Sequence, residues 1–284
     1  MSVKIITDSS SDLPAHIIEK YNIEVMPLLV NMQGKEYRDK VDVSPKEVYD
    51  YMRNEGVVKT AQITYGNFID KFRECAKTDE QYIYIAFSSG LSGTYQTSKL
   101  AETEIKEEYP DFDFHIIDTK CASLGEGLVV YKAAKMASEG CSKDEILETI
   151  DFYKDHMEHI FTVEDLKYLF RGGRVSKTAA VMGTVLNIKP ILDIEDGKLI
   201  PIEKIRGRKK SIKRMIEITQ ERAADFPNQV VGIDHGDDIE AAQFVKQKFE
   251  ELGVKEIVMS EVGASVGAHS GPGTLGIYFL NKLQ

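Results

Sequence analysis

The chain has 284 residues, with 36 basic and 46 acidic side chains and a formal net charge of −10. This length predicts one large or two ordinary domains with a core that needs no disulfide or metal to support it. The negative charge argues against general nucleic-acid binding, which needs a basic surface. Cys75, Cys121 and Cys141 are too few for a disulfide framework and form no C-x-x-C pair for a zinc module.

The charge is divided unevenly along the chain. Residues 1–165 hold 18 basic and 31 acidic side chains, net −13, whereas residues 166–284 hold 18 and 15, net +3. Such a split predicts two surfaces with different partners. The N-terminus leads directly into an apolar segment and has no signal-peptide pattern. The long uncharged segment 262–281 contains five glycines and a proline, which makes it a poor membrane-spanning helix. We therefore expect a cytoplasmic protein without integral membrane association.

Short apolar segments alternate with helical patterns in the first half of the chain. Strands are expected over residues 3–7, 23–30, 82–87 and 114–118. Helices are expected after Asp12 (an N-cap before Pro14), from Ser44, near Thr94, over 124–138 and from Ser142 to about His156. Ser44 with Glu47, and Ser142 with Glu145, have the spacing of capping boxes. This alternation predicts βαβ units and a mainly parallel sheet with flanking helices.

The second half has a different pattern. Segments 189–194 and 198–205 flank Glu195-Asp196-Gly197, which predicts a hairpin. An amphipathic helix, a strand over 230–234, a helix over 238–252 and a strand over 256–261 follow. We therefore expect a second α/β domain with a mixed sheet. With the boundary near 160–165, the N-terminal domain covers residues 1–163 and the C-terminal domain residues 164–284.

Polar loops follow three of the expected N-terminal strands, at residues 7–12, 88–94 and 118–123. The carboxyl ends of parallel strands lie at one sheet edge, where open α/β folds bind ligands. Hydroxyls and free N–H groups at helix starts suit an anion there. For any one of these loops taken alone, helix capping is the better explanation. Segment 88–94, with three serines and two glycines, has more than one cap needs.

The known sequence motifs for catalysis and metal binding are incomplete or absent in this chain. Residues 263–267 match G-x-S-x-G, but no acid follows Ser265 and His269 is only four residues away. The chain has no G-x-x-x-x-G-K-[ST] loop, so ATP binding in a P-loop is not expected. His156 and His159, three apart on an expected helix, lack a third ligand, and no metal is expected. A small-molecule enzyme, either a hydrolase or a phosphotransferase acting in a cleft between the two expected domains, is the alternative function.

A cationic segment lies at the start of the amphipathic helix of the second half. Its basic residues are Lys204, Arg206, Arg208, Lys209, Lys210, Lys213 and Arg214. A solvated helix face is the ordinary explanation of such a segment. Here several cations stand where the helix dipole disfavours them, so a compensating anion is expected: a phosphate, an acidic partner or the acidic first half of the chain itself.

Taken together, these segments resemble the DegV family of bacterial fatty-acid-binding proteins. The matching segments are 7–13, Lys59-Thr60-Ala61-Gln62, 89–95, Arg171-Gly172-Gly173-Arg174, 188–191, 206–210 and 269–274. Their order and spacing cover essentially the whole chain. The resemblance implies two α/β domains with a buried lipid tunnel and a carboxylate site between them.

The resemblance also implies roles for individual residues. Thr60 and Ser92 bind the fatty-acid carboxylate, with Gly93 beside Ser92 and His269 nearby. Arg206 is associated with a partner kinase and its phosphoryl transfer. Secondary candidates on the ligand loops are Ser9, Thr64 and Ser89.

The implied function is binding of a long-chain fatty acid, such as palmitate or oleate, in lipid transport or fatty acid metabolism. The bound acid would be presented to an ATP-dependent fatty acid kinase that makes acyl phosphate. No stand-alone catalysis and no cofactor besides the lipid ligand are expected. Each buried CH₂ contributes about 0.8 kcal/mol, so uncharged donors are expected to hold the carboxylate without a cation beside it. Ala61, Ile63, Thr64 and Phe170 depart from common family residues, which predicts a different tunnel shape and acyl preference.

Overall fold

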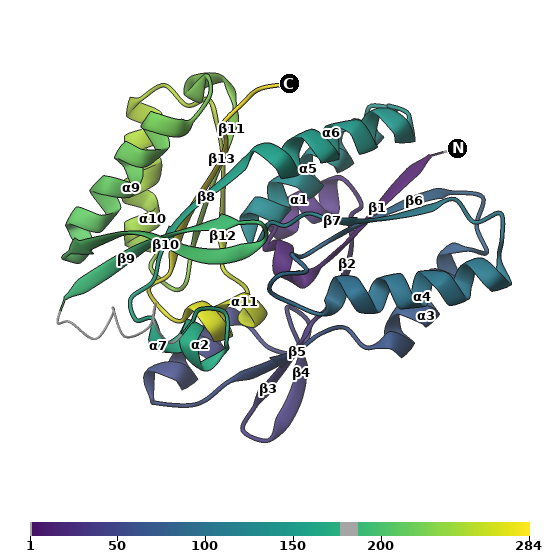
Figure 1. The fold of residues 1–284 in the computed structure, drawn as a ribbon, viewed down its shortest axis with the longest axis horizontal. Coiled ribbons are helices and arrows are strands. Elements are labelled where there is room, and N and C mark those ends of the chain that lie inside the picture. The colour runs from purple at the N-terminus through teal and green to yellow at the C-terminus, as the bar shows by residue number, and fades with distance from the viewer. Residues whose placement is uncertain (1, 177–186) are drawn as a thin grey trace.

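The computed structural model describes residues 2–176 and 187–284, which form two large sheets and one small sheet (Figure 1). The first large sheet has the order β2-β1-β6-β7 and is parallel throughout, as the sequence predicts. Its strands are β1 (Val3–Asp8), β2 (Glu24–Met26), β6 (Gln81–Ala86) and β7 (Phe114–Asp118).

The second large sheet has the order β10-β9-β8-β13-β11-β12. Its strands are β8 (Met157–Thr162), β9 (Ile188–Glu195), β10 (Lys198–Arg206), β11 (Val230–His235), β12 (Glu256–Glu261) and β13 (Leu275–Leu280). The pair β11–β12 is parallel and the other described pairs are antiparallel, which confirms the predicted mixed sheet. The predicted hairpin is also confirmed: Asp196 and Gly197 join β9 to β10 with positive φ.

The small sheet corrects the prediction of one strand over residues 23–30. The chain leaves the parallel sheet after β2 and enters β3 (Leu29–Met32), which pairs with β4 (Lys35–Arg38) and β5 (Lys59–Ala61). Pro27 lies between β2 and β3 and has no N–H for a sheet hydrogen bond, so one continuous central strand cannot form there. Thr60 thereby lies on β5, where it pairs with Val30.

Two further local predictions are wrong. Asp12 does not begin a helix: it ends the 3₁₀ turn η1 (Ser9–Ser11) in the left-handed conformation, and Pro14 is the N-cap of α1 (Ala15–Lys20). The Asp12 carboxylate instead bonds to groups far away in the sequence. His159 is not helical, because α6 (Lys143–His156) ends before β8 begins. Both predicted capping boxes are confirmed, at α6 and at α2 (Pro45–Arg53).

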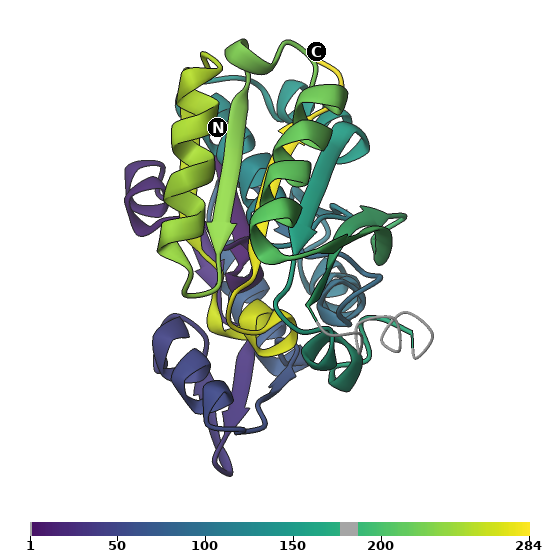
Figure 2. The same ribbon diagram turned by 90° about the vertical axis from the view of Figure 1, so that its left-hand side faces the viewer.

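Helices cover both faces of each large sheet. In the parallel sheet, α3 (Tyr65–Cys75) and α4 (Thr94–Glu108) pack on one face, and α1, α6 and α5 (Leu124–Ser138) pack on the other. Alternate side chains divide between these faces, so Ile6 packs toward α3 while Ile5 packs toward α5. Helices α9 (Arg208–Arg222) and α10 (Ile239–Glu251) cover the mixed sheet (Figure 2).

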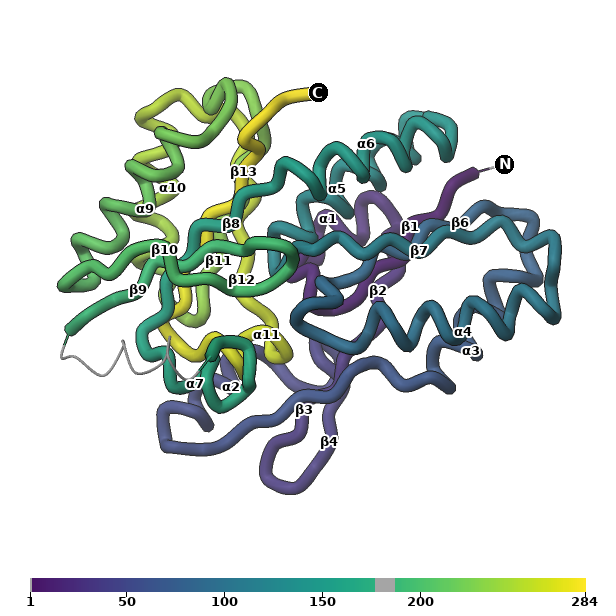
Figure 3. The backbone as a smooth tube through the Cα atoms, viewed as in Figure 1, coloured from purple at the N-terminus to yellow at the C-terminus, as the bar shows by residue number. Residues whose placement is uncertain are grey.

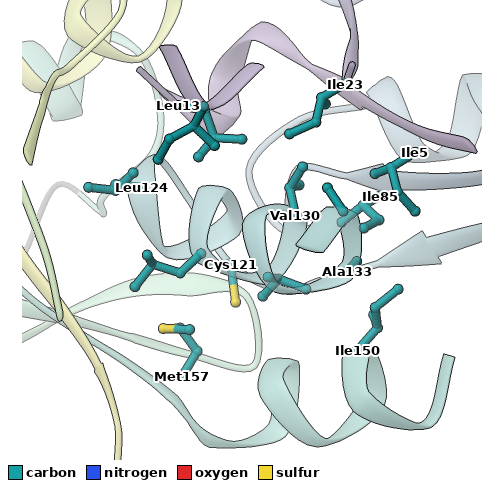
Figure 4. Close-up of a cluster of buried hydrophobic side chains, with 14 of the residues drawn as sticks. Ile5, Leu13, Ile23, Ile85, Cys121, Leu124, Val130, Ala133, Ile150 and Met157 are labelled. Carbon is teal, nitrogen blue, oxygen red and sulfur yellow. The ribbon is translucent and has the colours of Figure 1, made fainter. Parts of the chain in front are cut away.

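Helix α5 lies between the two large sheets and joins their cores. Its buried residues Leu124, Val130 and Ala133 belong to one cluster with Ile5 of the parallel sheet and Met157 of the mixed sheet (Figure 4). The same cluster contains Tyr278 of β13, the strand near the C-terminus that the sequence does not reveal. The transition to the mixed sheet comes at Met157; the domain limits of 1–163 and 164–284 stay a prediction.

A third group of elements lies beneath the two sheets, where α2, α7 (Lys167–Arg171) and α11 (Ala264–Ser270) gather beside the small sheet (Figure 3). Their shared core includes Val48, Tyr49, Tyr168 and Ala264. Helix α11 therefore contacts elements from both halves of the chain. Within residues 2–176 and 187–284, no helix has the length and apolar character needed to cross a membrane.

Candidate functional site

A cavity of about 370 Å³ lies at the carboxyl edge of the parallel sheet. All three polar loops predicted from the sequence contribute to it. Their lining residues include Ser10, Leu91, Ser92, Gly93, Ala122 and Ser123. The parallel order of β1, β6 and β7 brings these loops together, because each strand ends at the same edge.

The wall of the cavity is largely apolar and comes from both halves of the chain. The apolar lining side chains include Leu28, Phe87, Phe161, Leu169, Ile194 and Leu199. The volume falls within the range of about 300–1,000 Å³ that is typical of small-molecule pockets. A ligand that is mostly apolar, with few polar atoms, fits this composition.

All four predicted carboxylate-binding residues, Thr60, Ser92, Gly93 and His269, line this cavity. Thr60 on β5 and His269 on α11 are joined by a hydrogen bond of 2.6 Å between Oγ1 and Nε2. Ser92 and Gly93 directly precede α4, and the Ser92 hydroxyl lies 2.9 Å from the hydroxyl of Thr94. The structure thus brings together three segments that are distant in sequence.

His269 is a neutral hydrogen-bonding group at physiological pH. Burial, and then the charge of Arg174, lower the pKa of His269 to about 4. A neutral ring can donate from Nε2 to the Thr60 hydroxyl oxygen, which leaves the hydroxyl proton for an acceptor in the cavity. This arrangement suits a carboxylate, which has acceptor oxygens only.

A second cavity of about 250 Å³ adjoins this polar end. Thr60, Arg174 and His269 line both cavities, and Lys59 and Arg171 also line the second. The polar end of the apolar cavity therefore faces a space with three cationic side chains. Anions entering this space would meet a favourable field.

Arg174 is a site residue that the sequence does not single out. Its Nε donates to the Leu91 carbonyl at 3.0 Å, and its guanidinium also bonds to the Gly172 carbonyl. Burial lowers the Arg174 pKa from its usual value, but the group stays charged. The only sequence feature that could have pointed to Arg174 was the Arg171-Gly172-Gly173-Arg174 motif, in which glycines let the chain turn back. The structure thus adds a cation to a site for which only uncharged donors were expected.

The secondary candidates lie elsewhere. Ser9 is buried and donates to Asp39 at 2.9 Å, and the Thr64 hydroxyl caps α3 by accepting from the Asn67 N–H. The Ser89 hydroxyl accepts from Lys120 at 2.8 Å. None of the three is among the described residues that line the cavity; Ser10 is. Arg206 is exposed at the end of β10, away from the lining of both cavities among described residues.

A network of buried carboxyl groups lies next to the cavity and was also not predicted. The Ser123 hydroxyl is 2.5 Å from Asp12 Oδ2 and 2.7 Å from Asp234 Oδ2. One hydroxyl proton can serve only one of these contacts at a time, so protonation of one of the two carboxyl groups would let both contacts be hydrogen bonds. Burial raises the pKa of Asp234 to about 6, and burial also raises that of Asp12, which Lys40 opposes. Ser123 is 111 residues from each of the two aspartates, so local sequence patterns cannot predict these contacts.

Two large sheets with flanking helices enclose a largely apolar cavity whose polar end holds hydroxyls, the neutral His269 and the charged Arg174, and this arrangement defines a small-molecule-binding protein. The model of the DegV family, described as an uncharacterised protein family, matches residues 2–282. A DegV domain-containing protein of Clostridium perfringens is 40% identical over 284 residues, covering 99% of this chain and 98% of the relative. The chain therefore belongs to the DegV family.

Solved structures share this fold over nearly the whole chain. A DegV family protein from Thermus thermophilus, described for its fatty acid binding, has a TM-score of 0.90 and 31% identity, with 98% of this chain and 99% of that chain covered. DegV from Bacillus subtilis, described as a fatty acid binding protein, has a TM-score of 0.86 and 29% identity, with 98% of both chains covered.

Proposed function

We propose that this protein binds a long-chain fatty acid, such as palmitate or oleate, in the 370 Å³ cavity. The carboxylate is held by the hydroxyls of Thr60 and Ser92 and by the Gly93 backbone, with His269 supporting Thr60. The observation that carries this proposal is the convergence of β5, the start of α4 and α11 at one polar end of an apolar cavity. Arg174 supplies the compensating charge.

The fatty-acid-binding descriptions of the Thermus and Bacillus relatives support this ligand class. The physical chemistry agrees with it. A carboxylate in an apolar cavity needs hydrogen-bond donors or a nearby cation, and otherwise takes up a proton. The acyl tail needs only apolar wall, which contributes about 0.8 kcal/mol per buried CH₂.

Extraction of the purified protein tests this function directly. We expect denaturation and organic extraction to release a long-chain fatty acid that mass spectrometry identifies. Delipidated protein should then take up added palmitate or oleate with one ligand per chain. Empty extracts combined with no uptake of either acid would reject fatty-acid binding.

We further propose that the bound acid is presented to an ATP-dependent fatty acid kinase in the cytoplasm, without stand-alone catalysis by this chain. The second cavity supports this, because it places Lys59, Arg171 and Arg174 beside the polar end, where a phosphoryl group would arrive. Arg206 lies on the exposed end of β10 and is assigned to the kinase contact.

An Arg206→Ala variant tests the kinase contact. Acyl-phosphate formation by a fatty acid kinase should fall about tenfold or more with this variant, because a charged interface contact is lost. Palmitate binding should be unchanged. The matched control is Arg38→Ala. It removes another exposed arginine, which ends β4 and forms an ion pair with Asp42. Normal turnover by the Arg206 variant would reject its role.

The alternative of a hydrolase using Ser265 has less support. His269 Nε2 contacts Thr60, and no hydrogen bond between Ser265 and His269 is present among the described residues. The Ser265 backbone N–H binds Asp39 instead. Ester or phosphoryl-transfer activity of the purified chain alone would favour an enzyme.

A further inference from the structure

The helix that carries His269 is anchored at its other end by two carboxylates from the first half of the chain. Asp12 Oδ1 accepts the Gly263 N–H at 2.8 Å. Asp39 Oδ1 accepts the Ala264 N–H at 3.1 Å, and its Oδ2 accepts the Ser265 N–H at 3.2 Å. Three consecutive N–H groups at the start of α11 are thus bound by side chains more than 220 residues away.

These anchors are buried and well defined. Asp12 and Asp39 are 0% and 1% exposed. Lys40 Nζ lies 3.2 Å from Asp12 Oδ1 and supplies a charge partner, and Ser9 donates to Asp39. Neither aspartate is among the described residues that line the 370 Å³ cavity, so neither can touch a ligand there.

Helix α11 needs such anchors because it has seven residues. Isolated helices this short are unstable in water, so its direction is decided by contacts at its ends and sides. His269 lies five residues beyond Ala264, which is about 7.5 Å along the axis at about 1.5 Å per residue. A small rotation at the anchored end would therefore move the ring beyond the tolerance of about 0.5 Å that a preorganised site requires.

We propose that Asp39, assisted by Asp12, is a positioning residue that orients α11 so that His269 meets Thr60, and thereby sets the preference of the cavity for a carboxylate over an uncharged head group. The inference rests on the proposed fatty-acid function and deepens it. Without the anchor, the acyl tail still finds its apolar wall, but the hydroxyl of Thr60 loses the ring that directs its proton toward the ligand.

The test compares two ligands that share one tail. Delipidated wild type and Asp39→Asn are titrated with palmitic acid and with 1-hexadecanol. The amide keeps one acceptor oxygen and loses the second, and we expect affinity for palmitate to fall about tenfold or more. Affinity for hexadecanol should stay within about threefold, because the tail contacts are untouched. Asp42→Asn, a carboxylate three residues away that pairs with exposed Arg38, is the control and should leave both affinities unchanged.

A parallel fall for both ligands would show a structural role for Asp39 only, and unchanged affinity for both would also overturn the proposal. If Asp39→Asn does not fold, Asp12→Asn takes its place with the same expectations, since it removes the anchor at Gly263.

A ligand-free measurement separates this proposal from the proposed function. In the wild type, burial holds the His269 pKa at about 4. If the helix turns in Asp39→Asn, the ring gains water, and NMR titration of its imidazole nitrogens should show the pKa rising toward about 6.5. An unchanged His269 titration would reject the positioning role. A wild type that binds neither ligand would reject the fatty-acid function while this titration still tests Asp39.

Discussion

Replacement of Thr60 and Ser92 together by alanine is expected to lower palmitate affinity by about two to four orders of magnitude. In the proposed site each hydroxyl donates to the charged carboxylate, and a hydrogen bond of this kind contributes about 1.5–3 kcal/mol. Every 1.4 kcal/mol corresponds to about a tenfold change in the dissociation constant. The Thr60 replacement also removes the partner of His269 Nε2, which then has no bond to direct it. Calorimetric titration of delipidated protein measures the loss.

Thr64→Ala is the matched control for this double variant. It removes the same hydroxyl four residues further on, from the N-cap of α3 outside the cavity lining. We expect unchanged palmitate affinity and a stability loss of about 1 kcal/mol from the lost cap. Full affinity in the Thr60/Ser92 variant would place the head group elsewhere. Weakened binding in Thr64→Ala would return that residue to the site.

Replacement of Lys40 by methionine is expected to destabilise the fold by about 3 kcal/mol at pH 8 and by much less at pH 5. Lys40 lies 3.2 Å from buried Asp12, and its charge also lowers the pKa of Asp39, which burial raises to about 6. Without the cation, two ionised carboxyl groups stay buried and unpaired, which typically costs about 3–5 kcal/mol. The loss of stability expected here, about 3 kcal/mol, is at the lower end of this range. The reason is that the Lys40 side chain is one quarter exposed, so water already weakens its interaction with the carboxyl groups.

The pH dependence follows from the direction of these pKa shifts. A carboxyl group whose pKa is raised by folding destabilises the native state above that pKa, and the cost disappears as pH falls toward the unfolded value of about 3.9. Removal of Lys40 raises the pKa values of Asp12 and Asp39 further, so in the variant Asp39, whose pKa burial already raises to about 6, is protonated at pH 5, and Asp12 ionises less readily than in the wild type. The deficit should therefore grow as pH rises from 5 to 8.

Urea denaturation at both pH values measures this difference, since urea, unlike guanidinium chloride, adds no screening salt. Lys46→Met is the control because its ion pair with Asp50 is solvent-exposed, and it should leave the unfolding free energy unchanged at both pH values. An equal deficit for Lys40→Met at pH 5 and pH 8 would contradict the charge explanation.

Local signals allowed much of the fold to be predicted. The capping boxes at Ser44 and Ser142 act over three residues, and the hairpin at Asp196-Gly197 depends on two, so both predictions are confirmed. The strand expected over 23–30 failed because its apolar composition continues across Pro27 although the two parts belong to different sheets. The strand β13 escaped notice because glycines around it resemble a loop, while its pairing with β8 and β11 is non-local.

At the polar end of the cavity, too, some residues could be predicted from local motifs and others could not. Hydroxyl-rich loops and family motifs pointed to Thr60, Ser92, Gly93 and His269, and the structure places these residues around one cavity. Arg174 and the aspartates that hold α11 carry no comparable signal. Their function depends on which distant groups they face.

The sequence alone determined the α/β class, the parallel arrangement that brings the polar loops to one sheet edge, the family, and four polar-end residues of the cavity, Thr60, Ser92, Gly93 and His269. These depend on short-range periodicity, caps and motifs, which act between neighbours in the chain. Only the tertiary structure decided that Thr60 meets His269, that Arg174 brings a charge to a site expected to have none, and that Asp12 and Asp39 hold α11. Hydrogen bonds and burial depend on distance in space, and partners separated by more than 200 residues leave no periodic trace in the chain.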